Sequence, residues 1–292
     1  MKIGVATRNP DSWCSTRLRE AISKRGYEPF CFRLSRLYAR VGFRPLAEVE
    51  GVKVPEELPA IIVRPIGKCS LEEAIFRMDV LRRLERHGAV VVNRASAIEK
   101  CVDKYYALSL LEEAGIPVPR TVVAESAREA LKAFYELGGD VVLKPLFGSR
   151  GIGVARISDP DVAARVFNLL QFLHDVIYLQ EFIPHGTRDI RVFVVGGEVV
   201  AAMYREGTGW KTNIAQGARA KPLKPCEELE ELALRASEVL ECEVAGVDVL
   251  EGPSGYLVTE INSQPGWRGI QSVTKTDIAQ KIVDYVISKT RR

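Results

Sequence analysis

The sequence predicts an α/β fold with a small parallel sheet, followed by lobes of the α+β type. In the first 95 residues, compact Val and Ile runs alternate with helical patterns, which implies a parallel sheet covered on both faces. Further along, strand patterns occur in groups around few helices, and one pair is joined by a two-residue glycine turn. We therefore expect three units, at residues 1–95, 96–185 and 186–292.

Composition excludes several classes of protein. The 292 residues are 47% hydrophobic and 27% charged, which is typical of a globular chain with sizeable cores. Six cysteines and three histidines show no metal-ligand spacing, so zinc sites and disulfide scaffolds are not expected. A net charge of +3 is too small to indicate nucleic-acid binding. No apolar run approaches the roughly 20 residues of a membrane span, so we expect a cytoplasmic protein without a membrane partner.

The first unit has strand and helix patterns that end at glycines. The helices are predicted at residues 15–25, ended by Gly26, and at residues 71–87, closed by Gly88. The strands are predicted at residues 2–7, 29–34, 60–64 and 89–93.

The second unit begins with Ser96 and Glu99, which have the spacing of a capping box at the start of a helix that should continue past Leu108 and end at Gly115. Ser126 and Glu129 repeat that spacing, and the second helix should stop at Gly138. Strands are predicted at residues 121–124, 141–146, 153–157 and 177–182.

In the third unit, Gly196 and Gly197 join two strands as a hairpin turn in which both residues take positive φ. The strands on either side are residues 190–195 and 198–204, followed by a loop at residues 205–224. The remaining elements are helices at residues 227–240 and 277–288 and strands at residues 245–250 and 256–261.

The stretch "VTEINSQPG" at residues 258–266 carries a candidate metal site. Because side chains alternate along a strand, Glu260 and Asn262 share one face. A five-residue loop at 251–255 would return the chain antiparallel, which brings Asp248 within about 4.5–8 Å of Glu260. An all-oxygen cluster suits Mg²⁺ or Mn²⁺. The alternative is a solvent-exposed sheet face.

A glycine-rich loop follows a strand that ends in a lysine. Gly148, Gly151 and Gly153 lie between two predicted strands, so the loop is neither a Walker loop nor a dinucleotide fingerprint. Its bare N–H groups could lie against phosphate oxygens, and the alternative is a flexible hairpin tip. Lys144 at the end of a buried strand indicates an anionic partner. Lys104 is either a second phosphate ligand or a solvated helix lysine.

These residues, in this order and spacing, resemble the ATP-grasp ligases, and most closely the RimK-like α-L-glutamate ligases. The segments "DIRVFVVGGEVVAAMYR", "TNIAQG" and "EINSQPGWRGIQSVTKTDIA" look like that subfamily, and the resemblance covers nearly the whole chain. It implies a three-lobed ATP-grasp fold with an N-terminal Rossmann-like pre-grasp domain.

The resemblance also implies residue roles. The residues that would bind ATP are Lys104, Lys144, Gly148, Ser149, Gly151, Gly153, Gln180, Glu181, Phe182, Ile183, Asp189, Lys211, Thr212 and Asn213. Of these, Gln180 to Ile183 would hold adenine, and Asp189 would accept hydrogen bonds from the ribose. Arg191 and Arg205 would stabilise the transferring phosphoryl group, and Asp248, Glu260 and Asn262 would carry two Mg²⁺ or Mn²⁺ ions.

The implied reaction is ATP-dependent joining of a carboxylate to an amine through an acyl phosphate. L-Glutamate would be the amine donor. Arg268 would bind the carboxylates of glutamate, and Arg64 would contact the acceptor. The aromatic residue at this position, Trp267, makes the loop similar to that of the archaeal branch, which glutamylates pterin or deazaflavin cofactors. In that case Trp267 would stack on the planar ring of the cofactor, but a packing role beneath the loop is equally open. Relatives of this kind commonly associate, so we expect a homo-oligomer.

Three alternatives stay open. A ribosomal protein or a carrier protein of the LysW type could be the acceptor in place of a small molecule. A kinase on the same fold would share every nucleotide-binding residue but would transfer phosphate stably to a hydroxyl. A non-catalytic ATP sensor is disfavoured, because it would not need the complete metal set.

Overall fold

The computed structural model describes residues 1–148, 151–212 and 217–290. Its N-terminal part contains a four-stranded parallel sheet of order β2-β1-β6-β7. The strands are β1 (Lys2–Ala6), β2 (Glu28–Phe32), β6 (Ala60–Val63) and β7 (Val90–Val92). All four match predicted strands to within two residues at either end.

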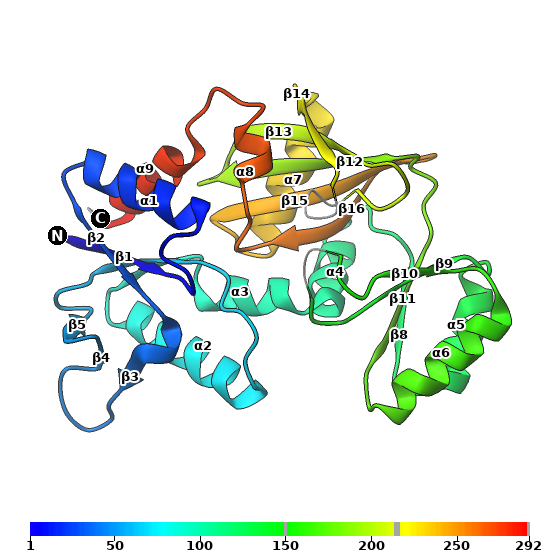
Figure 1. Cartoon of the computed structure of the whole chain (residues 1–292), viewed down its shortest axis with the longest axis horizontal. Coiled ribbons are helices and arrows are strands. Elements are labelled where there is room, and N and C mark those ends of the chain that lie inside the picture. The colour runs from blue at the N-terminus through cyan, green and yellow to red at the C-terminus, as the bar shows by residue number, and fades with distance from the viewer. Residues whose placement is uncertain (149–150, 213–216, 291–292) are drawn as a thin grey trace.

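Helices cover both faces of this sheet, and one of them comes from the other end of the chain. Helix α1 (Trp13–Lys24) and the C-terminal helix α9 (Ile278–Thr290) lie side by side on one face (Figure 1). Ile3 and Val5 of β1 share a buried cluster with Ile282 and Val286 of α9. Helix α2 (Leu71–Arg86) packs on the opposite face. Burial on both sides explains why these strands are almost continuously apolar.

A small antiparallel sheet on the α2 side was not predicted. Its strands are β3 (Leu37–Ala39), β4 (Ala47–Val49) and β5 (Val52–Val54), preceded by the 3₁₀ turn η1 (Leu34–Arg36). With three residues each, these strands are too short to show an alternating pattern. Leu37, Val49 and Val54 are buried with α2 against the parallel sheet.

The central part is an antiparallel sheet of order β10-β9-β11-β8 with two helices against it. Its elements are β8 (Thr121–Ala124), α5 (Ala127–Glu136), β9 (Val141–Lys144), β10 (Ala155–Ile157), α6 (Pro160–Phe172) and β11 (Ile177–Glu181). It has its own buried cluster, centred on Phe134 and Phe167, and lies apart from the N-terminal sheet (Figure 1).

The C-terminal part is a five-stranded antiparallel sheet of order β14-β13-β12-β15-β16. Its elements are β12 (Arg188–Val195), β13 (Glu198–Glu206), β14 (Arg219–Leu223), α7 (Glu227–Val239), β15 (Val244–Gly252), β16 (Gly255–Asn262) and the short α8 (Arg268–Gln271). Gly196 and Gly197 form the predicted hairpin turn with φ of 60° and 82°. Helix α7 and two earlier helices, α3 (Ala95–Val102) and α4 (Lys104–Glu113), share one buried cluster with this sheet.

Several local predictions were wrong. Ser96 is not a helix cap, because α3 already begins at Ala95, and the Ser96 hydroxyl donates instead to Glu241. The single helix predicted there is also interrupted. Helix α3 ends at Val102, and Asp103 caps a separate helix, α4. Residues 219–223, placed in a loop, form the edge strand β14.

The predicted N-cap at Ser126 is confirmed, since its hydroxyl accepts the N–H of Glu129. The predicted five-residue loop after Leu250 is shorter, because β15 and β16 continue to a two-residue turn between Gly252 and Gly255. Among the described helices, none is both long and apolar enough to cross a membrane.

Candidate active site

A cleft lies between the central sheet and the C-terminal sheet and holds most of the predicted site residues. It encloses about 880 Å³ of empty volume, open solvent included. The predicted residues that line it are Lys104, Lys144, Gly148, Gly151, Gln180, Glu181, Phe182, Ile183, Asp189, Arg205, Lys211, Thr212, Asp248 and Glu260.

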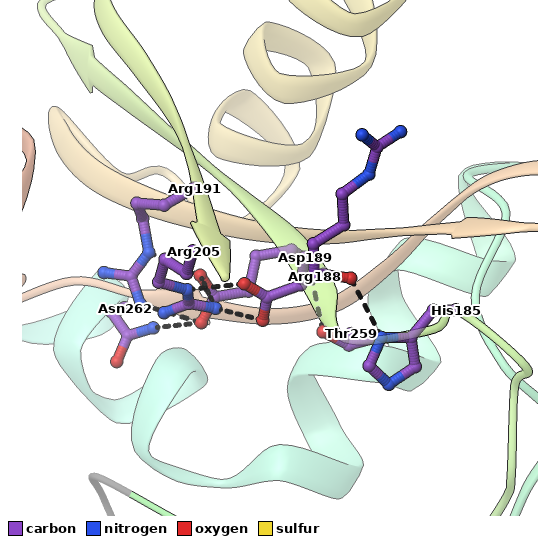
Figure 2. Close-up of polar contacts among 8 residues, drawn as sticks. His185, Arg188, Asp189, Arg191, Arg205, Thr259 and Asn262 are labelled. Carbon is purple, nitrogen blue, oxygen red and sulfur yellow. Dashed lines mark hydrogen bonds and ion pairs between the residues drawn. The ribbon is translucent and has the colours of Figure 1, made fainter. Parts of the chain in front are cut away.

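Asp248, Glu260 and Asn262 meet on adjacent strands as predicted. Asp248 of β15 pairs directly with Glu260 of β16, and Asn262 donates from Nδ2 to Oδ2 of Asp248 at 3.5 Å. Figure 2 shows Asn262 pointing toward the arginine and carboxylate cluster. The three side chains therefore present carboxylate and amide oxygens from one sheet face.

Thr259 also lines the cleft, although strict alternation would turn it away from Glu260. The register between β15 and β16 shifts after Asp248, so Thr259 is an extra residue in a bulge. Its hydroxyl donates to the carbonyl oxygen of Asp248 at 3.2 Å. A bulge re-aims a side chain in this way, and the sequence carries no signal for it.

Two arginines and two aspartates form a buried charged network beside these ligands (Figure 2). Arg205 binds Asp189 through Nε and Nη2 at 2.7 and 2.6 Å, and its Nη2 lies 3.0 Å from Oδ1 of Asp248. Arg191 makes a two-pronged contact with the same Asp248 carboxylate. Both contacts use the fork geometry that guanidinium groups also offer to phosphate.

This network determines the charges in the cleft. Burial alone would favour the neutral form of Asp248, but Arg191 and Arg205 outweigh it and hold the pKa of that carboxyl below its usual value. Burial likewise opposes a charged Arg205, yet Asp248 and Asp189 raise its pKa. The site therefore keeps an ionised carboxylate next to two cations.

Lys144 faces these groups from the central sheet. Burial lowers the pKa of Lys144 to about 8, although the Glu260 carboxylate acts in the opposite direction. Its ammonium donates to Oε1 of Gln180 at 2.7 Å, and Gln180 in turn donates to the Thr121 hydroxyl at 2.9 Å. A half-buried cation that donates to a neutral amide is suited to an incoming anion.

Two more lysines of the cleft lining bind carbonyl oxygens at the two ends of the glycine-rich segment. Lys104 donates to the carbonyl oxygens of Leu146 at 3.3 Å and of Gly148 at 3.0 Å. Lys211 of the C-terminal part donates to the carbonyl oxygen of Val154 at 2.8 Å. Lysines from two other parts of the chain thus hold the two ends of the segment.

The other end of the cleft is apolar and aromatic, which the sequence predicted only in part. Phe182 packs edge-to-face with Trp210, with ring centroids 6.1 Å apart, and the Arg156 guanidinium lies 3.5 Å from the Phe182 centroid. The lining residues that were not predicted are Val142, Pro145, Ile152, Val154, His185, Trp210, Leu250 and Thr259. Trp210 had a signal, since it directly precedes the predicted Lys211.

The donor set fits a nucleotide with a divalent cation. Apolar and aromatic side chains at one end, and cations with glycine backbone at the other, match a base and its phosphates. The oxygens of Asp248, Glu260 and Asn262 are of the kind that Mg²⁺ prefers. A methyl group on Gly246 would lie 2.6 Å from Nη1 of Arg191, so this close approach requires glycine.

Several predicted residues lie elsewhere. Arg191, Asn262 and Gly153 adjoin the cleft without lining it. Ser149 and Asn213 fall outside the described residues. Arg268 is exposed at the start of α8.

Arg64 and Trp267 pack together at the seam between the N-terminal sheet and the loop after β16. The Arg64 guanidinium lies 4.6 Å from the Trp267 centroid and is 7% exposed. Trp267 is 0% exposed and meets Trp13 and Phe193 edge-to-face. The packing role for Trp267 is therefore the one observed, and its ring has no free face for a ligand.

The fold and the cleft define an ATP-grasp enzyme, a class that uses ATP and Mg²⁺. Two family models match consecutive parts of the chain: the RimK PreATP-grasp domain at residues 1–98 and the RimK-like ATP-grasp domain at residues 101–286. The chain belongs to the RimK-like ATP-grasp family and is an ATP-dependent carbon–nitrogen ligase.

Named relatives and solved structures agree with this assignment. The chain is 32% identical to a tetrahydromethanopterin:alpha-L-glutamate ligase of Methanosarcina acetivorans, covering 98% of both chains. It is 34% identical to the enzyme of that name from Methanococcus maripaludis, covering 99% of this chain and 98% of the relative.

A RimK domain ATP-grasp protein from Sphaerobacter thermophilus has the same fold, with a TM-score of 0.78 and 24% identity over 98% of this chain and 100% of that one. The ATP-grasp ligase PsnB, solved with a minimal precursor, Mg and ADP, has a TM-score of 0.77 and 23% identity over 100% of this chain and 98% of its own.

Proposed function

We propose that this protein joins L-glutamate to the carboxylate of a small acceptor, and that the acceptor is a pterin cofactor. The observation that carries the reaction is the cleft in which Asp248 and Glu260 face Lys144, with Arg191 and Arg205 behind them. The choice of glutamate and pterin follows the names of the archaeal relatives, which align along nearly the whole chain.

In this proposal the central and C-terminal lobes hold ATP between them. Lys104 and Lys144 bind the phosphates beneath the glycine-rich segment, and the apolar slot around Phe182 binds adenine. Asp189 accepts hydrogen bonds from the ribose. The division of the chain into units at residues 1–95, 96–185 and 186–292 stays a prediction.

Asp248, Glu260 and Asn262 would hold two divalent ions, and bound Mg²⁺ or Mn²⁺ would neutralise charge on the phosphates. The remaining work falls to positioning and to cationic side chains, because phosphoryl transfer asks for little covalent chemistry from a protein. Arg191 and Arg205 are held in place by Asp248 and Asp189, so their N–H groups are oriented before substrate arrives.

The acceptor carboxylate takes the γ-phosphoryl group and becomes an acyl phosphate. The amino group of glutamate then attacks the acyl carbon, and phosphate leaves with the bonding electrons. Water would destroy the acyl phosphate, so the cleft must stay closed during this step. Lys104 and Lys211, which fasten the glycine-rich segment from two sides, supply that closure.

The acceptor would approach from the N-terminal sheet, where Arg64 is buried without a carboxylate partner among the described residues. Trp267 orients Arg64 by stacking and is not itself the ring platform. Arg268, which is exposed beyond Asn262, would meet the carboxylates of glutamate. A homo-oligomer remains a prediction.

The test is ADP release with Mg·ATP, L-glutamate and a panel of acceptors. The panel contains a pterin with a terminal carboxylate, a deazaflavin with a terminal glutamate, a ribosomal C-terminal peptide and an acidic carrier protein. We expect release that depends on the pterin, with a product heavier by one glutamyl residue. A peptide or carrier product would replace the pterin as acceptor. A product that gains only a phosphate would establish a kinase and overturn the ligase mechanism.

A further inference from the structure

Helix α3 is fastened along its length to the segment that leads into β15. At the start of the seam, Asn93 accepts the N–H groups of Glu243 and Val244 through Oδ1, both at 2.8 Å. Its side-chain amide donates in turn to the carbonyl oxygen of Val244 at 2.6 Å. These buried bonds fix the alignment of two segments about 150 residues apart in the chain.

Further along the helix the seam continues through Glu241. The Ser96 hydroxyl donates to Oε2 of Glu241 at 2.9 Å, and the Lys100 ammonium lies 3.2 Å from Oε1 of the same carboxylate. Cys101 follows Lys100, and Cys242 follows Glu241. The pairing therefore brings the two thiols together with little freedom to separate.

The sulfur atoms of Cys101 and Cys242 lie 3.3 Å apart, and both cysteines are free thiols. A disulfide bond is about 2.05 Å long, so the sulfurs need to approach by only about 1.3 Å. Cys242 is buried, whereas Cys101 is partly exposed. The contact with Cys101, together with burial, raises the pKa of the Cys242 thiol. Cys101 is thus the sulfur that an external reagent meets first.

We propose that Cys101 and Cys242 form a redox modification site that small disulfides, such as oxidised glutathione, convert to an intramolecular disulfide. The Cys101 thiolate attacks one sulfur of oxidised glutathione, the S–S bond breaks, and a glutathione thiolate leaves and takes up a proton. Cys242 then gives up its proton and attacks the Cys101 sulfur, which releases the second glutathione. Two protein thiols are oxidised, and one glutathione disulfide is reduced to two thiols.

The position of this site gives the bond a structural consequence. Cys101 lies two residues before Asp103, which caps α4, and Lys104 is the first residue of that helix. The disulfide would tie this entry to the strand that carries Asp248. The lysine that reaches Gly148 would then extend from a covalently anchored base.

Tryptic mapping of the whole oxidised chain tests the proposal without any substrate. The protein is treated with oxidised glutathione, remaining thiols are alkylated, and peptides are compared with and without reduction. Cleavage places Cys101 in peptide 101–104 and Cys242 in peptide 236–268, which has no internal Lys or Arg. We expect one cross-linked species of these two peptides as the main product, and it should disappear on reduction.

Matched variants make the result decisive. Cys226→Ser removes an exposed thiol outside the seam and should leave the cross-link intact. Cys101→Ser should abolish it, while Cys242 stays unmodified because it is buried. Glutathione retained on Cys101 without a cross-link, or a disulfide that joins other cysteines, would overturn the proposal. None of these outcomes depends on whether the chain ligates glutamate.

Discussion

Lys144 offers a direct test of the nucleotide site through pH. Its ammonium, whose pKa burial lowers to about 8, is the form that attracts phosphate, and bound phosphates should keep it charged. In the free protein it is about 90% charged at pH 7 and about 10% charged at pH 9. Binding above pH 8 must therefore take up a proton. ATP affinity should fall about tenfold from pH 7 to pH 9, equivalent to about 1.4 kcal/mol.

The measurement is the dissociation constant of Mg·ATP by titration calorimetry at several pH values, in buffers of different ionisation enthalpy to detect proton uptake. Lys144→Arg should remove the slope, because guanidinium stays charged throughout this range. Lys211→Arg retains Lys144 and should keep the slope. Equal slopes for the original protein and Lys144→Arg would refute the reasoning, because the titrating group would then lie elsewhere.

Three further substitutions test the candidate site and the packing around Trp267. Glu260→Gln keeps the shape of the side chain but removes a carboxylate, so the Mg²⁺ concentration for half-maximal turnover should rise at least about tenfold, and the melting temperature should not change. An unchanged Mg²⁺ requirement would exclude Glu260 as a ligand. Gly246→Ala places a methyl group 2.6 Å from Nη1 of Arg191, so it should displace that guanidinium and lower kcat about tenfold or more. A kcat equal to that of the original protein would show that Arg191 does not act in turnover. Trp267→Ala leaves a cavity at a fully buried position and should lower the free energy of urea unfolding by about 3–5 kcal/mol, and Trp267→Phe should lower it less. A loss below about 1 kcal/mol, which is typical of a surface residue, would contradict the packing role.

Local pattern was enough to predict most secondary structure and the strand face that carries Glu260 and Asn262. Period-two alternation put Glu260 and Asn262 on one side of a strand, and a glycine pair marked the β12–β13 hairpin. Both features depend on residues close in sequence. The direct pairing of Asp248 with Glu260 followed because the two strands are neighbours along the chain.

Where long-range contacts compete with a local motif, the pattern misled. Ser96 and Glu99 have the spacing of a capping box, but Ser96 binds Glu241, and Glu99 binds Arg82 from α2. Tertiary partners in both cases outweigh a cap worth about 1 kcal/mol. The four residues of the capping-box motif do not reveal those partners, which lie 145 and 17 residues away.

The sequence by itself therefore determined the alternation of strands and helices, the acidic and amide side chains on one strand face, and the resemblance that pointed to the family. Only the tertiary structure decided that α9 closes the N-terminal sheet, that Thr259 turns into the cleft, that Trp267 is buried under Arg64, and that Cys101 meets Cys242. The physical reason is that periodicity reports which side of an element is apolar, whereas the choice of partner for that side depends on how distant elements pack together.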